Sequence, residues 1–260
     1  MEEKLYWIWL SRINSLGTIK MKKLLEIYGS PRKLWNESRD NLLKIEGISK
    51  KNVDEILNKV YRKDLEKYLC YMEKNNIKII TILDKDYPEK LKNIYDPPQI
   101  LFVKGNEKIL NEFSLAIIGC RQNSEYGKIM AKRIAKDLVN KDIVTISGLA
   151  RGIDSISQKE TVINKGKTIA VLGNGLDTIY PPENFYLAEE IIKNGGAIIS
   201  EYIVGTKPLK LNFPRRNRII SGMSDGVIVI EAKEKSGTMI TVDFALEQGK
   251  QVFALPRKYN

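Results

Sequence analysis

Short runs of hydrophobic residues alternate with longer amphipathic segments over most of the chain. The runs after residue 110 lie at 115–118, 143–146, 168–172, 197–199, 227–230 and 252–255. Between most of them hydrophobic residues recur with helical spacing, as at 126–139, 184–193 and 240–248. Strands that are apolar along their whole length are typical of a parallel sheet buried on both faces. The pattern therefore predicts an α/β fold, a parallel sheet with helices on both faces.

The region before residue 110 has a different pattern. Helical spacing over 64–75 is followed by apolar runs at 77–82 and 99–103, which predict two strands joined by a short connecting helix. The first 60 or so residues contain segments with helical spacing only. We therefore predict a small all-α domain at 1–63 and a sheet domain at 64–260.

Two segments of the all-α domain share a turn pattern, 14–19 (NSLGTI) and 45–50 (IEGISK). Each places a glycine between hydrophobic residues at a junction of two helices, with basic residues following. Glycine permits a tight turn, and the N–H groups that begin the next helix can hold a phosphate. The pattern is that of a helix-hairpin-helix, and a helical bundle that merely packs is the alternative.

Small and basic residues follow the strands of the predicted sheet. Because ligands of parallel α/β sheets bind beyond the carboxyl ends of the strands, these positions are candidates for a site. Glycines let a backbone approach a ligand, and arginine suits phosphate oxygens. The candidates for an anion site are Gly119, Arg121, Ser147, Gly148, Arg151, Gly152, Gly173, Ser236, Gly237 and Thr238.

The segment 207–218 has the highest density of positive charge. It holds five basic residues, one aromatic ring and no acidic residue. Cations that follow a backbone beside a ring that stacks a base are typical of single-strand binding. The candidates are Lys207, Lys210, Phe213, Arg215, Arg216, Asn217 and Arg218. A solvated charge run is the alternative, and since Ile219 and Ile220 follow directly, we expect at least one arginine to be structural and to pair with Glu201 or Glu231.

Composition supports a polyanionic partner and excludes several chemistries. Lys and Arg number 43 against 32 Asp and Glu, a net charge of +11, which favours nucleic acid, although a lysine-rich genome would also produce a basic protein. The absence of histidine excludes histidine-based triads and metal sites. Two distant cysteines predict reduced thiols, and no apolar run reaches the ~20 residues of a membrane span. We expect a cytoplasmic protein without membrane contact.

No motif for a cofactor is present. A Walker A sequence is missing because Gly-Lys-Ser/Thr does not occur, and Gly173-Asn174-Gly175 lacks the third glycine of a dinucleotide fingerprint. We therefore expect neither a nucleotide cofactor nor a metal.

Several motifs resemble those of the DprA/Smf family of DNA-processing proteins and occur in the same order along the chain. They are GCR at 119–121, SGLARGID at 147–154, TIAVLG at 168–173, FPRRNRII at 213–220 and SGT at 236–238. The resemblance covers roughly residues 87–256, and the helices before it resemble the family's sterile-alpha-motif-like domain. It implies an extended Rossmann-like fold.

The resemblance also implies a function. It implies a DNA-binding protein without catalytic activity, which protects incoming single-stranded DNA in natural transformation and loads RecA onto it. It further implies a homodimer through the sheet domain and a DNA pocket formed by Arg121, Lys210 and Phe213. This chain departs from the family at Ser157-Gln158, where a histidine is usual. Many members continue into a winged-helix domain, which we expect to be absent here.

The main alternative is an enzyme of a similar fold, a nucleoside-monophosphate phosphoribohydrolase of the lysine-decarboxylase-like superfamily. Such enzymes carry a double glycine and a catalytic glutamate in the turn that corresponds to 234–241. Here the double glycine is missing and Thr241 stands in place of the glutamate, which removes the acid/base group. A nucleotide-sensing module is a third possibility.

Overall fold

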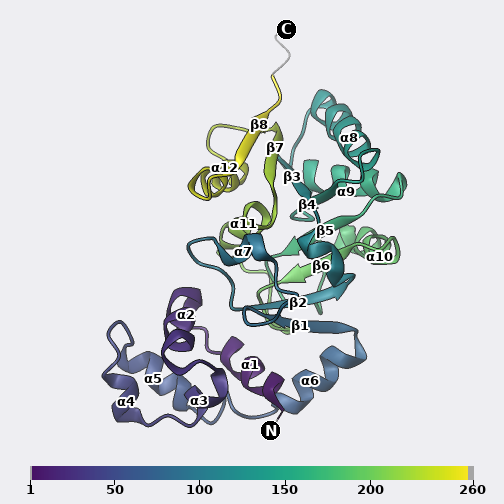
Figure 1. The fold of residues 1–260 in the computed structure, drawn as a ribbon. Helices are drawn as coiled ribbons and strands as arrows, with labels where there is room; N and C mark the ends of the chain where they lie inside the picture. Colours follow the sequence, from purple (N-terminus) through teal and green to yellow (C-terminus); the bar gives the residue numbers. More distant parts are fainter. Residues whose placement is uncertain (1, 257–260) are drawn as a thin grey trace.

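The computed structural model describes residues 2–256. Met1 and 257–260, the last four residues of the predicted sheet domain, lie outside the described residues. Figure 1 shows a group of helices beside the β1 end of a larger α/β unit. The chain begins with helices only: α1 (Glu3–Ser11), α2 (Gly17–Tyr28), α3 (Pro31–Trp35), α4 (Arg39–Leu43), α5 (Lys50–Leu57) and α6 (Leu65–Lys74).

The two predicted turns of the all-α region are present as helix–turn–helix junctions. Residues 14–19 join α1 to α2, and 45–50 join α4 to α5; Gly17 and Gly47 have φ values of +59° and +83°. The buried Asn52 side chain at the start of α5 donates from Nδ2 to the backbone oxygen and to Oγ of Ser15, each at 2.9 Å. The beginning of α5 therefore holds the first turn in place.

The helix at 65–74 contacts both parts of the molecule. We assigned it to the sheet domain, and it packs against α1 as well as β1. Buried residues of α1–α6 belong to the same hydrophobic cluster as Ile77, Phe102 and Leu172 of the sheet. The helical region is thus packed onto the sheet, and the domain boundary at residue 63 stays a prediction.

The sheet has eight strands in the order β1-β2-β6-β5-β4-β3-β7-β8. They are β1 (Ile77–Thr81), β2 (Ile100–Gly105), β3 (Ser114–Gly119), β4 (Val144–Ser147), β5 (Thr168–Leu172), β6 (Ala197–Ser200), β7 (Gly226–Glu231) and β8 (Gln251–Ala254). The strands β3–β8 pair in parallel, as predicted, whereas β2 is antiparallel to both β1 and β6. The sheet is therefore mostly parallel, with one reversed strand.

Helices cover both faces of the sheet, as the apolar runs predicted (Figure 1). Along β5, Ile169 and Val171 belong to one buried cluster, and Ala170 and Leu172 to the other, as the period of two in a strand requires. One face carries α6, α8 (Glu125–Val139), α9 (Ile153–Ile163) and α10 (Phe185–Lys193); the other carries α7 (Glu89–Lys92), α11 (Asn212–Met223) and α12 (Gly237–Glu247). In residues 2–256 we find no helix with the length and apolar character needed to cross a bilayer.

The sheet has a topological switch point at β3. This strand has β4 on one side and β7 on the other. The helices that follow β3 and β7, α8 and α12, lie on opposite faces of the sheet. Loops that leave neighbouring strands toward opposite faces open a crevice at their carboxyl ends, where ligands of such sheets bind.

Candidate nucleic-acid interface

The loops that follow β3 and β4 interlock through two glycines. A Cβ at Gly119 would lie 2.5 Å from Cγ1 of Ile153, and a Cβ at Gly152 would lie 2.3 Å from the backbone oxygen of Cys120. Gly152 also has φ +78°, a conformation that other residues avoid. Only glycine permits this approach, which brings the loop of Arg121 against the loop of Arg151.

The Arg121 loop is anchored from the neighbouring strand. Ser124 caps α8 by accepting a hydrogen bond from the Gly127 N–H at 3.0 Å. Oε2 of Glu231, at the end of β7, accepts from the Ser124 N–H at 2.9 Å and from its hydroxyl at 3.1 Å. The exposed Arg121 therefore lies at the switch point, on a loop fixed at both ends.

Arg216 is not a surface candidate, contrary to our prediction. Its side chain is buried, and Nη1 donates to the backbone oxygens of Gly148, at 2.8 Å, and Val171. A Cβ at Gly148 would lie 2.7 Å from Nη2, so this glycine makes room for the guanidinium. Burial lowers the pKa of Arg216 to about 10 against the opposing effect of Asp154, so the group is charged at neutral pH. Arg216 ties α11 to the ends of β4 and β5.

Arg218 is also buried, which corrects its assignment to DNA contact. Its guanidinium binds both carboxylate oxygens of Glu201, at 2.9 and 2.6 Å, and its Nε donates to Oδ2 of Asp96 at 2.8 Å. Burial opposes the charge, but the two carboxylates outweigh it and raise the pKa of Arg218. The expectation that one arginine of this segment pairs with Glu201 is confirmed.

Phe213 lies over the end of β5. A Cβ at Gly173 would lie 3.0 Å from Cδ1 of Phe213, and the ring centroids of Phe213 and Tyr180 are 5.5 Å apart. Phe213 is half-buried, so one part of its ring packs on the protein and the rest is accessible. The segment we treated as a basic loop becomes helical at Asn212, where α11 begins; Lys207 and Lys210 precede it and are exposed.

The remaining candidates divide between structure and surface. Ser147 is buried and donates from Oγ to the backbone oxygen of Ile117 at 2.7 Å, so its assignment to DNA contact was wrong. Thr238 is also buried, and Ser236 donates to the backbone oxygen of Lys233. Exposed Gly237 accepts from Nδ2 of Asn217 at 3.2 Å, a bond that joins α12 to α11.

The fold thus brings the ends of β3, β4 and β5 together with the first turn of α11. Contacts between the loops join Arg121 to Gly152, and Arg216 and Phe213 join α11 to Gly148 and Gly173. Five predicted cations around this junction are exposed: Arg121, Arg151, Lys207, Lys210 and Arg215. Arg151 pairs with Glu183 on the surface. The arrangement offers positive charge and a partly exposed ring.

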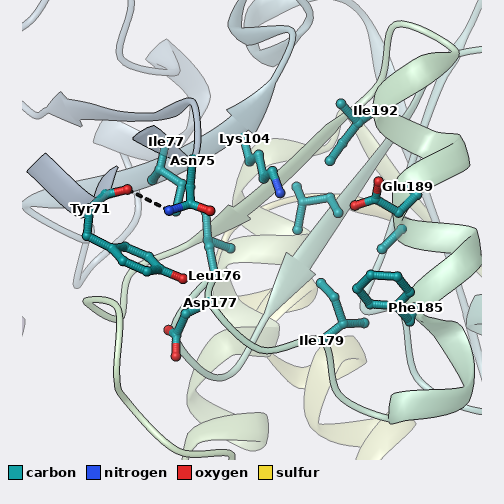
Figure 2. A pocket seen from close by; sticks show the side chains of 12 residues that line it. Tyr71, Asn75, Ile77, Lys104, Leu176, Asp177, Ile179, Phe185, Glu189 and Ile192 are labelled. Carbon is teal, nitrogen blue, oxygen red and sulfur yellow. Dashed lines mark hydrogen bonds between the residues drawn. The ribbon is translucent and has the colours of Figure 1, made fainter. Parts of the chain in front are cut away.

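A separate cavity of about 220 Å³ lies between α6 and α10 (Figure 2). Lys104 reaches into it, and Asp177 and Glu189 stand at its edge. Two carboxylates against one cation do not suit a polyanion, so we do not assign DNA to this cavity. The sequence pattern carried no signal for it, because its lining comes from segments far apart in the chain.

Fold and site together define a Rossmann-like α/β protein with a cationic, anion-attracting edge at its switch point. A model of the family described as DNA recombination-mediator protein A matches residues 78–260. The chain belongs to this family.

Similar proteins come from several bacteria. The chain is 45% identical over 195 residues to protein Smf of Escherichia coli, and 45% identical over 193 residues to DNA processing protein DprA of Bacillus subtilis. These alignments cover 75% and 74% of this chain but 52% and 65% of the two relatives, so the chain spans only part of their length.

Two solved structures are similar over most of the chain. DprA from Streptococcus pneumoniae superposes with a TM-score of 0.82 at 36% identity and covers 98% of this chain and 87% of its own. DNA processing protein A from Helicobacter pylori gives 0.64 at 34% identity, covering 70% of this chain and 83% of its own.

Proposed function

We propose that this chain binds single-stranded DNA at the edge formed by the ends of β3, β4 and β5 and the start of α11. The observation that carries the proposal is the half-buried Phe213 among exposed cations. In this proposal Arg121 and Lys210 bind phosphates, and the accessible part of the Phe213 ring stacks against a base. Cationic tracks beside aromatic rings bind single strands in this way. The DNA processing protein A from Helicobacter pylori, a relative, binds single-stranded DNA.

We further propose that the protein protects incoming DNA in natural transformation and loads RecA onto it, in the cytoplasm. The family's description as a recombination mediator supports this role. Assembly into a homodimer through the sheet domain belongs to the same proposal. It is supported by the edge strand β8, whose Phe253 is 54% exposed, because an unpaired edge strand is a template for pairing with another chain.

The double variant Arg121→Ala/Lys210→Ala tests the pocket. We expect weaker binding of an oligonucleotide and a nearly unchanged thermal melt, because both side chains are exposed. Each lost phosphate contact should reduce the slope of log affinity against log salt by about 0.7. Fluorescence anisotropy at several salt concentrations measures both effects. The matched control is Lys132→Ala/Arg133→Ala, which removes the same charges from exposed positions of α8; equal affinities of the two double variants would refute the pocket.

We also expect no release of free base from nucleoside monophosphates. Thr241, which stands where a phosphoribohydrolase has its glutamate, is buried in α12 at 3% exposure, and a hydroxyl there cannot act as the acid/base group. Chromatography of nucleotide incubated with the protein measures the product. Reproducible base release that Arg121→Ala abolishes would establish the enzyme instead.

A further inference from the structure

A groove of about 1070 Å³ lies between the first two helices and the sheet domain. We call it the inter-domain groove. One wall is the turn after α1 and the start of α2, with Thr18, Ile19 and Lys20. The other is the segment before and into α11, with Leu209, Leu211 and Arg215. Its volume lies just above the roughly 300–1,000 Å³ of small-molecule pockets, which fits a segment of a polymer.

The charge of the inter-domain groove suits an anion. Arg12, Lys20, Arg215 and Arg218 line it, together with the carboxylates of Asp96 and Glu201. Both carboxylates are bound to Arg218, at 2.8 and 2.6 Å. Arg218 offsets one of these two negative charges, and the four cations of the lining outnumber its two carboxylates. Lys20 and Arg215 stand on opposite walls. Facing cations of this kind attract a phosphate backbone.

Apolar side chains between these cations remain open to solvent. Ile19 is 53% exposed, Leu209 56% and Leu211 74%. Apolar side chains can pack against the faces of unstacked bases. A groove with cationic edges and apolar walls offers a single strand a place for both its backbone and its bases.

The groove and the proposed DNA site lie on two sides of the start of α11. Arg215, in the groove, and Phe213, over Gly173, stand two residues apart in the first turns of α11. Side chains two apart on a helix point to nearly opposite sides. A strand whose base stacks on Phe213 therefore needs only to cross the first turn of α11 to enter the groove.

We propose that the inter-domain groove holds the continuation of the bound single strand, and that the 14–19 turn forms its second wall. This inference rests on the proposed function and adds a contact surface on the helical region. The turn is held for this task by the bonds from Asn52 to Ser15. Lys20 is held in turn by Oδ1 of Asn52, at 2.8 Å. DNA that is too short to span α11 should not reach this wall.

Opposite charges placed at Thr18 test the inference. Thr18 is half-buried in the first turn of α2, which has no acidic residue. Glutamate there stabilises the helix and lysine weakens it, because the amino end of a helix carries partial positive charge. The effect on a bound phosphate is the opposite: glutamate at this position repels the phosphate and lysine attracts it. We expect Thr18→Glu to weaken binding of an oligothymidine of about 16 nucleotides roughly fivefold, and Thr18→Lys to strengthen it.

Chain length and a matched control make the result specific. An oligothymidine of about 4 nucleotides should bind both Thr18 variants like the unchanged protein. Lys20→Ala should reduce the salt slope for the longer strand by about 0.7. Lys22→Ala, two residues further along α2 and outside the groove lining, should leave it unchanged. Thermal melts confirm that the variants fold.

The outcomes separate this inference from the proposed function. If the Thr18 and Lys20 variants bind the longer strand like the unchanged protein while Arg121→Ala/Lys210→Ala loses affinity, the groove does not hold DNA and the proposed function stands. A segment of another protein would then be the better occupant of the groove. If the unchanged protein binds neither strand, the proposed function itself fails.

Discussion

Arg218→Met should lower the free energy of unfolding by about 3–5 kcal/mol, the cost of removing one partner from a buried ion pair. The side chains of Arg218 and Glu201 are 4% and 10% exposed. Without the guanidinium, the Glu201 carboxylate would stay buried and unpaired, whereas Asp96, at 31%, can turn to water. Urea unfolding followed by circular dichroism measures the loss.

Two further variants isolate the cause. Arg215→Met makes the same change three residues earlier on α11 at an exposed position, and should alter stability by no more than about 0.5 kcal/mol. The double variant Arg218→Met/Glu201→Gln should be more stable than Arg218→Met alone, because no unpaired charge remains buried. If Arg218→Met unfolds at the same urea concentration as Arg215→Met, the buried network does not stabilise the fold.

Phe213→Ala should weaken single-strand binding by about 1–3 kcal/mol, the range measured for one stacked base. The loss on duplex should be much smaller. Duplex bases are already stacked on their neighbours, and extruding one costs a few kcal/mol. Titration of the same oligonucleotide as single strand and as duplex, at one salt concentration, measures the difference.

The packing of Phe213 on Gly173 makes a structural role the competing explanation. Phe213→Tyr keeps the ring and should keep single-strand affinity. Phe113 directly precedes the amino end of β3, whereas the proposed site lies at the carboxyl end. Phe113→Ala removes a ring that is 58% exposed and should leave DNA binding unchanged. Equal losses on single strand and duplex, together with a lower melting temperature for Phe213→Ala, would show that the ring only anchors α11.

The strands were predictable from sequence because both faces of the sheet are buried. A strand covered on two sides is hydrophobic at most positions, so 169–172 and 227–230 stand out as unbroken apolar runs. Whether a strand pairs in parallel or antiparallel with its neighbours does not show in its amino-acid pattern. The run at 99–103 predicted β2, but nothing in its composition shows that β2 is antiparallel to β6.

The region of the proposed site followed from the sequence more readily than the role of each residue. Glycines at the carboxyl ends of strands pointed to the edge at which we propose DNA to bind, and Arg121 and Lys210 are exposed there, as a contact role requires. Arg216 and Arg218 look like surface residues in a basic run. Their burial depends on Gly148, Val171, Glu201 and Asp96, which lie 17 to 122 residues away in the chain. Local charge density does not report such partners.

The 122 residues between Asp96 and Arg218 also set an order of events during synthesis. A ribosome adds roughly 5–20 residues per second, so Asp96 is made roughly 6–24 seconds before the arginine that binds it. Over that interval the strands β2–β6 are synthesised, but α11, which covers part of one face of the sheet, is not yet present. The nascent chain must therefore keep this apolar face from premature association until α11 arrives and Arg218 closes the network.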